Sequence, residues 1–133
     1  MSASPAFTST PRIGIGQVST ANTNRDGTGT IIDVLSAVGV SAGTKIFEVV
    51  VKATADPADS VITLFLHDGT NYRLFDEVDL GDPAAGSTVL PSYRAATTYS
   101  NLVLPNNWKL CAAITVAPTA GVVNVIAFGG DLT

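Results

Sequence analysis

The sequence predicts an all-β protein, a sandwich or barrel of seven or eight short strands. Runs rich in β-branched and aromatic residues alternate with clusters of Gly, Pro, Asn and Asp, at intervals of roughly 8–12 residues. No segment has a convincing amphipathic helical period. At 133 residues the chain fits one domain, and it contains no internal repeat.

The strongest local signal is a hairpin over 61–78, in which two strand-forming runs flank Asp68-Gly69. Asp-Gly is typical of hairpin turns because Gly adopts positive φ without steric cost and Asp tolerates it. A two-residue turn would place Phe65 opposite Tyr72, and a three-residue loop would place Leu66 opposite Tyr72. We favour the second register because it gives the cleaner apolar face.

The other expected strands follow along the chain. Segment 45–55 is the clearest, with Phe47, Val49 and Val51 on one face and Ile46 on the opposite face. The remaining strands are expected at 13–18, 31–35, 108–116 and 122–128, with a short one at 87–90. In 108–116 we expect Leu110 and Ile114 on the apolar face, and in 122–128 Val123, Val125 and Ala127 share one face. We expect the last strand to end before the Gly129-Gly130 pair, and segment 92–101 shows no clear period.

The N-terminal segment 1–11 is expected to form an arm, which leaves 12–133 as the β-sandwich domain. It consists of Ser, Thr, Ala and Pro with a single aromatic residue, Phe7, and such a composition cannot support a core. Two interpretations remain open: a disordered arm, or one that becomes ordered against a partner. In the second, Phe7 and Ile13 are the candidate partner-binding residues. The segment has neither the basic nor the apolar region of a signal peptide, so we expect synthesis in the cytoplasm.

The composition indicates a surface that meets another protein chain. Apolar residues make up 46% of the chain and charged residues 14%, against a usual charged fraction of about 25%. The net charge is −4 and the seven bases are scattered, which argues against a nucleic-acid partner and against an anionic membrane surface. The apolar runs are also far shorter than the ~20 residues that span a bilayer.

No combination of residues predicts catalysis, so we expect no enzyme and no catalytic residues. The single cysteine, Cys111, lies in an apolar run, where it is interpreted as a small buried hydrophobic residue. His67 and Asp68 are adjacent, and neighbouring residues of a strand point to opposite faces. The acidic residues within 76–79 are interpreted as a solvated strand end.

No metal or cofactor is expected either. Segment 22–27 reads Asn-x-Asn-x-Asp-Gly, with Asp33 six residues after the glycine, which imitates a calcium loop. However, Asp replaces the usual Glu at the last position, Arg25 adds a positive charge, and the flanks are strand-like. A turn held by side-chain hydrogen bonds is therefore favoured, and calcium binding stays an alternative. The glycines of 27–29 are too few, and lack a following helix, for phosphate binding.

Three aromatic residues offer a further alternative. Trp108, Tyr72 and Tyr99 could form a platform for a sugar ring. Trp108 is also in phase with the apolar face of its strand, which favours core packing.

Four segments resemble small proteins encoded among the structural genes of tailed phages and prophages: TANTNRDGTGTI (20–31), LFLHDGTNYRLFDEV (64–78), NLVLPNNWKL (101–110) and NVIAFGGDL (124–132). The likeness lies in turns and strands and brings no catalytic motif, so no functional residue is carried over. It implies a virion component, with a capsid decoration (cement) protein in first place. Such proteins often resemble β-sandwiches or jelly rolls and commonly form trimers on capsid symmetry axes.

We therefore expect a single antiparallel β-sandwich, jelly-roll-like, that binds the major capsid protein on the capsid surface of a tailed phage as a homo-oligomer, with a trimer favoured. Its role would be to bridge neighbouring capsid subunits. Deleting residues 1–11 is expected to weaken attachment without unfolding the sandwich. The alternatives are a tail, neck or fibre-associated virion protein and a carbohydrate-binding module.

Overall fold

The computed structural model describes residues 8–81 and 84–132, and this part of the chain forms eight β-strands. They are β1 (Thr8–Val18), β2 (Ile32–Ser36), β3 (Thr44–Ala53), β4 (Val61–His67), β5 (Tyr72–Asp79), β6 (Arg94–Leu104), β7 (Lys109–Ile114) and β8 (Val123–Leu132). In the described ranges, no helix is long and apolar enough to cross a membrane.

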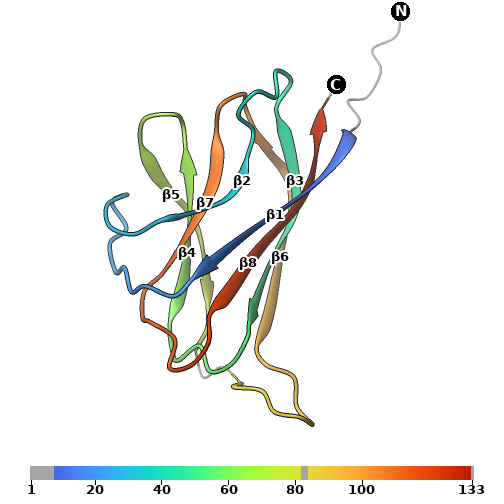
Figure 1. Ribbon diagram of the computed structural model, residues 1–133. Coiled ribbons are helices and arrows are strands. Elements are labelled where there is room, and N and C mark those ends of the chain that lie inside the picture. The colour runs from blue at the N-terminus through green and yellow to red at the C-terminus, as the bar shows by residue number, and fades with distance from the viewer. Residues whose placement is uncertain (1–7, 82–83, 133) are drawn as a thin grey trace, which may run out of the picture.

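The strands form two four-stranded antiparallel sheets with the orders β1-β8-β3-β6 and β2-β7-β4-β5 (Figure 1). The pairs β1–β8, β2–β7, β3–β6 and β4–β5 are nested around the central hairpin. This nesting, folded into two sheets, is the arrangement of a jelly roll. The predicted fold class is therefore confirmed, and the hairpin that gave the strongest sequence signal is the centre of the nest.

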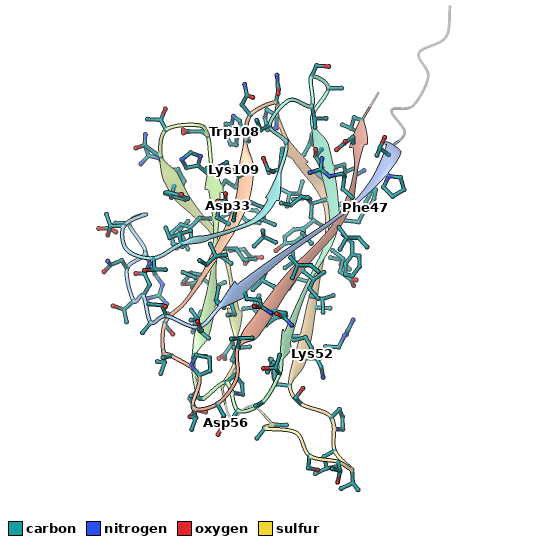
Figure 2. The ribbon with its side chains drawn as sticks, viewed as in Figure 1. Asp33, Phe47, Lys52, Asp56, Trp108 and Lys109 are labelled. Atoms are coloured by element: carbon teal, nitrogen blue, oxygen red, sulfur yellow. The ribbon has the colours of Figure 1, made fainter. Side chains whose placement is uncertain are left out.

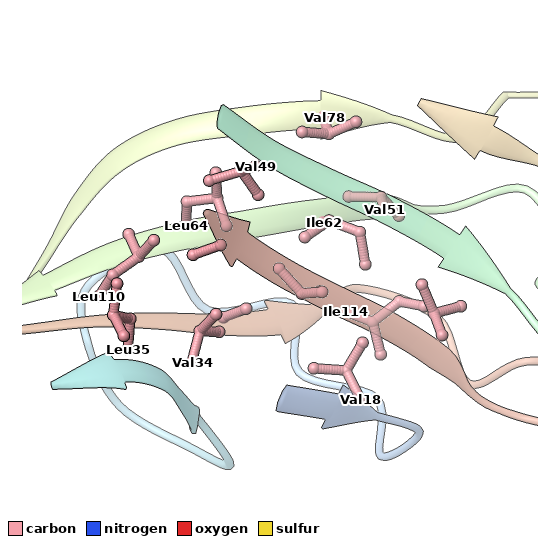
Figure 3. Packing of buried hydrophobic residues seen from close by; sticks show 14 of the residues in the cluster. Val18, Val34, Leu35, Val49, Val51, Ile62, Leu64, Val78, Leu110 and Ile114 are labelled. Atoms are coloured by element: carbon pink, nitrogen blue, oxygen red, sulfur yellow. The ribbon is translucent and has the colours of Figure 1, made fainter. Parts of the chain in front are cut away.

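The main core lies between the two sheets and is formed by alternate residues of facing strands (Figure 3). Strand β8 follows the predicted alternation, because Val123, Val125 and Ala127 are fully buried between the sheets. Strand β7 contributes Leu110 and Ile114 from its apolar face, as expected.

Strand β3 departs from the predicted alternation because it contains a β-bulge. Ile46 pairs with Gly129 and Glu48 with Phe128, so Phe47 is the extra residue between them. The side chain of Ile46 is fully buried, whereas Phe47 is 41% exposed on the other side of the sheet. The prediction that Phe47 shares the core face of Val49 was therefore wrong, because the bulge exchanges the two faces at this point.

Neither predicted register of the β4–β5 hairpin is observed. His67 pairs with Tyr72, so the loop has four residues, 68–71. The Asp68 carboxylate accepts hydrogen bonds from the backbone N–H groups of Thr70 and Asn71, at 2.9 and 2.8 Å, which lowers its pKa and holds this longer loop. Further along, Phe75 is a bulged residue and packs against the main core.

Two other boundaries differ from the sequence prediction. Strand β1 begins at Thr8, which pairs with Leu132, so the last four residues of the expected arm belong to the sheet; residues 1–7 lie outside the described part. Strand β8 continues through its glycines instead of ending before them. A side chain at Gly129 would meet the carbonyl oxygen of Lys45 at 2.1 Å, so glycine permits the close pairing there.

Between β5 and β6 the sequence prediction was also incomplete. The run 87–90 is a tight turn instead of a strand: the N–H of Ser87 donates to the carbonyl oxygen of Leu90 at 2.8 Å. The Ser87 hydroxyl oxygen, in turn, accepts hydrogen bonds from the N–H groups of Val89 and Leu90. Most of segment 92–101, which has no clear period, belongs to the long strand β6.

Close contact between β1 and β2 closes one edge of the sandwich. The inward positions of β1 are Gly14, Gly16 and Val18, and a Cβ atom at Gly14 would lie 2.1 Å from the carbonyl oxygen of Val34. A side chain at this position therefore cannot be accommodated unless the two strands separate.

We predict that Gly14→Ala lowers the free energy of unfolding by about 3 kcal/mol, near the upper end for overpacking. The matched control is Gly81→Ala, at an exposed bend where a Cβ atom would meet only the carboxylate of Asp79, at 3.2 Å. The control should stay within about 1 kcal/mol of the wild type. Denaturant unfolding measures both variants, and equal stabilities would contradict the close contact.

Candidate interaction surface

The side chains with potential reactivity meet on the outer side of the second sheet (Figure 2). Lys109 Nζ lies 3.2 Å from Asp33 Oδ2, and the Cys111 thiol donates to Asp33 Oδ1 at 3.4 Å. Burial, and then the hydrogen bond to Asp33, raise the pKa of Cys111 to about 12. Its side chain is fully buried, so the thiol is not a nucleophile near neutral pH, and the predicted role as a buried residue is confirmed.

The loop between β1 and β2 covers this side of the second sheet (Figure 1). The N–H of Asn22 donates to the carbonyl oxygen of Ile114 at 2.8 Å, and Arg25 forms an ion pair with Glu77. Beneath the loop lies a second apolar cluster, built on Phe65, Cys111 and Ala113 and flanked by Ile31 and Tyr72. The outer side of this sheet is therefore protected by the chain itself.

The side chain of Asn22 organises that loop. Its amide nitrogen donates to the carbonyl oxygens of Thr28 and Thr30, at 2.9 and 3.0 Å, and its oxygen accepts from the N–H of Asn24 at 3.0 Å. Asp26 accepts from the N–H and hydroxyl of Thr28, and these bonds lower its pKa.

These bonds confirm the predicted turn held by side chains. Asp33, the last position of the calcium-like pattern, instead contacts Lys109 and Cys111. In residues 8–81 and 84–132, no three His, Cys, Asp or Glu side chains gather into a possible metal site.

The three aromatic residues of the possible sugar platform lie in different environments. Trp108 and Tyr99 pack against the main core, whereas Tyr72 packs against the second cluster. The centroid of the Tyr72 ring lies 4.4 Å from that of the His67 ring. The Tyr99 hydroxyl donates to Asp76 Oδ2 at 2.7 Å, and burial raises the pKa of Tyr99. The structure does not bring them together into one platform.

The outer side of the first sheet carries exposed apolar side chains that no other described segment covers. Ile13 and Ile15 are 62% and 60% exposed, and they pair with Phe128 and Ile126 of β8. Val50 lies beside Ile126, and it is only 6% exposed although it is not part of the main core. We call this surface the apolar face, defined by Ile13, Ile15, Phe47, Val50, Ile126 and Phe128.

The predicted residue Ile13 lies on the apolar face, whereas Phe7 lies outside the described residues. Sequence reasoning missed the other members. The alternation in β1 could have found Ile15, because the strand places Gly14 and Gly16 inward and therefore isoleucines outward. For Phe47 there was no such signal, since a bulge exposes it.

The charge of the first sheet differs in sign from that of the whole chain. Its four strands contain four bases, Arg12, Lys45, Lys52 and Arg94, and two acids, Glu48 and Asp131, for a net charge of +2. The chain as a whole carries −4. Arg12 and Asp131 form an ion pair at 3.0 Å, so the excess positive charge comes from the two lysines and Arg94.

A second exposed apolar feature lies at the tip of the β5–β6 loop, which projects beyond the ends of the strands (Figure 1). Val89 is 85% exposed and Leu90 is 66% exposed. The hydrogen bonds of Ser87 fix this turn. We call the turn 87–91 the apolar knob.

The chain matches no protein-family model and no curated protein by sequence. Among solved structures, it is similar to a chain of the acidic stable capsid structure of Helicobacter pylori bacteriophage KHP30, with a TM-score of 0.59 and 10% identity over 97% of this chain and 95% of that chain. A chain of the cyanophage Pam1 capsid asymmetric unit aligns with a TM-score of 0.45 and 20% identity, over 98% and 92% of the two chains. The likeness to the KHP30 chain shows a shared fold along nearly the whole length.

We predict that Asn22→Ala loosens the loop over the second sheet and lowers the free energy of unfolding by about 1–3 kcal/mol, because buried hydrogen bonds are lost. Cys111 should then react with a thiol reagent in the native protein several-fold faster than in the wild type. The control is Asn24→Ala, which removes only an exposed bond to the Thr28 hydroxyl. Equal labelling rates in the three proteins would contradict a covering role for the loop.

Proposed function

We propose that this protein is a structural component of a tailed-phage virion, most specifically a capsid decoration (cement) protein. It would bind the major capsid protein on the capsid surface as a homo-oligomer, with a trimer favoured, and bridge neighbouring capsid subunits. The observation that carries the proposal is the jelly-roll fold, matched along nearly its whole length by a chain of the KHP30 capsid structure. The two chains are also of similar length, since each is almost fully covered.

The difference between the two outer surfaces supports this proposal. The loop around Asn22 covers the second sheet, whereas the first sheet exposes the isoleucines of β1. An apolar surface of this kind favours a permanent interface, because obligate interfaces resemble a domain core cut in half. The low charged fraction of 14% points in the same direction.

A static, non-enzymatic role also fits the environment of the reactive side chains. Cys111 is buried with a raised pKa, and the Nδ1 atom of His67 accepts a hydrogen bond from the N–H of Gly69 at 3.2 Å. Asp33 and Lys109 neutralise each other in an ion pair. The proposed mechanism is therefore mechanical and uses shape and apolar contact, without a cofactor.

Copy number tests the proposal. Quantitative mass spectrometry of purified particles should give a ratio to the major capsid protein of one to one, or a simple fraction of it. A handful of copies would indicate the tail, neck or fibre instead. Absence from particles would contradict a virion role, and glycan binding, followed by the fluorescence of Trp108, would then be tested next.

The role proposed for Phe7 is tested by a deletion. Because β1 begins at Thr8, deleting residues 1–7 instead of 1–11 leaves the sheet intact. We predict unchanged denaturant unfolding and at least about tenfold weaker binding to capsids that lack the protein, with Phe7→Ala reproducing much of the loss. The control is Ser4→Ala in the full chain. Equal capsid binding by the deleted and full-length chains would exclude an anchoring role for the segment.

A further inference from the structure

We propose that a groove between the outer strands β5 and β6 is a binding site for a neutral sugar ring. These strands belong to different sheets and form the edge of the sandwich opposite β1 and β2. The groove has a volume of about 340 Å³, and its lining residues are Phe75, Thr98, Tyr99, Ser100, Asn101 and Leu102. Small-molecule sites have volumes of about 300–1,000 Å³, so the groove suits a small ligand.

β-bulges in both strands build this groove. On β5, Phe75 is an extra residue without a pairing partner on β4. On β6, the three residues 99–101 stand opposite Phe47 alone. Four of the six lining residues are therefore bulged residues, and they come from two different sheets. Bulges redirect side chains and are over-represented beside functional sites, so their meeting at one groove is the first argument for a ligand site.

The two aromatic rings of the groove are already oriented in the unbound protein. The ring centroids of Phe75 and Tyr99 lie 5.4 Å apart, with 40° between the ring planes. The Tyr99 hydroxyl donates to Asp76 Oδ2 at 2.7 Å, and this bond holds the ring from outside the groove. Little side-chain entropy is therefore lost when a ligand packs against the rings. The carbon–hydrogen face of a pyranose ring is apolar and suits such an aromatic wall.

The remaining side chains supply hydrogen-bonding groups at the rim. Thr98, Ser100 and Asn101 are exposed, and within residues 8–81 and 84–132 their side chains form no hydrogen bond. Each hydroxyl can both donate and accept, and the amide offers two donors and one acceptor. An apolar wall beside such a rim matches a ligand that has one apolar face and hydroxyl groups around its edge, which is the chemistry of a sugar.

Charge decides in favour of a neutral ligand. Among the described residues, no charged side chain lines the groove. The nearby carboxylate of Asp76 already accepts the Tyr99 hydroxyl and the N–H of Glu77, the latter at 2.8 Å. A phosphate, carboxylate or ammonium group would lose water in the groove without gaining an opposite charge, which is costly. A neutral sugar ring meets no such cost.

The experiment titrates the isotope-labelled full chain with four probes and follows its backbone amide signals by NMR. The probes are the methyl glycosides of glucose, galactose, mannose and N-acetylglucosamine, each added to about 20 mM, so that dissociation constants in the millimolar range are detected. We expect at least one probe to shift the signals of residues 98–102 and of Phe75. If none of the four probes shifts these signals, the inference is overturned.

Two variants and two matched controls locate the site. Asn101→Ala removes the rim amide and Phe75→Leu removes one ring, and each should raise the dissociation constant at least about tenfold. Asn106→Ala removes the same amide from an exposed turn outside the groove, and Phe128→Leu removes the same ring from the first sheet. Both controls should bind as the wild type does. The amide spectrum establishes that each variant is folded.

Other outcomes overturn the inference. Binding of wild-type strength in either groove variant, or shifts centred on Trp108 instead of β6, would exclude the groove as the site. Tighter binding of methyl glucuronide than of methyl glucoside would exclude a neutral ligand. The inference does not depend on the virion role, which copy number in particles tests separately, so failure of one is distinguishable from failure of the other.

Discussion

The close approach of β1 to β2 is the constraint on which the candidate interaction surface depends. Gly14 faces Val34 so closely that a side chain has no room, and this contact closes one edge of the sandwich. Because side chains alternate along a strand, glycine on the inside places Ile13 and Ile15 on the outside. The residues that close the fold therefore also determine which apolar side chains reach solvent.

The two outer surfaces of the sandwich are treated differently by the same chain. The long loop after β1 returns across the second sheet, and Asn22 holds it with bonds to Thr28 and Thr30. No described segment covers the first sheet in this way. In this sheet Ile13 pairs with Phe128, and Ile15 pairs with Ile126. This asymmetry gives the molecule one protected side and one side suited to contact with a partner.

The nested pairing explains how the sandwich can present both a face and a knob. Among the eight strands, only β4 and β5 follow one another within one sheet, and the other connections, including the long one between β5 and β6, lead from one sheet to the other. Its tip is free to project, and the Ser87 turn makes it rigid. The knob lies in a long sheet-crossing connection, and its apolar residues Val89 and Leu90 are not part of the main core.

By itself, the sequence determined the fold class, the central hairpin and the alternation of β8. These depend on local turn chemistry and on side-chain period, which are properties of neighbouring residues. It also indicated that Cys111 is buried, and it offered Ile13 as a candidate partner-binding residue, whose side chain is exposed in the structure. The tertiary structure alone decided the exposure of Phe47, because a bulge shifts the register without a clear local signal. The four-residue hairpin loop was also seen only in the structure, where the Asp68 carboxylate accepts hydrogen bonds from the N–H groups of Thr70 and Asn71. It also decided that β8 continues through Gly129, since only the approach of Lys45 from β3 shows why glycine is needed there.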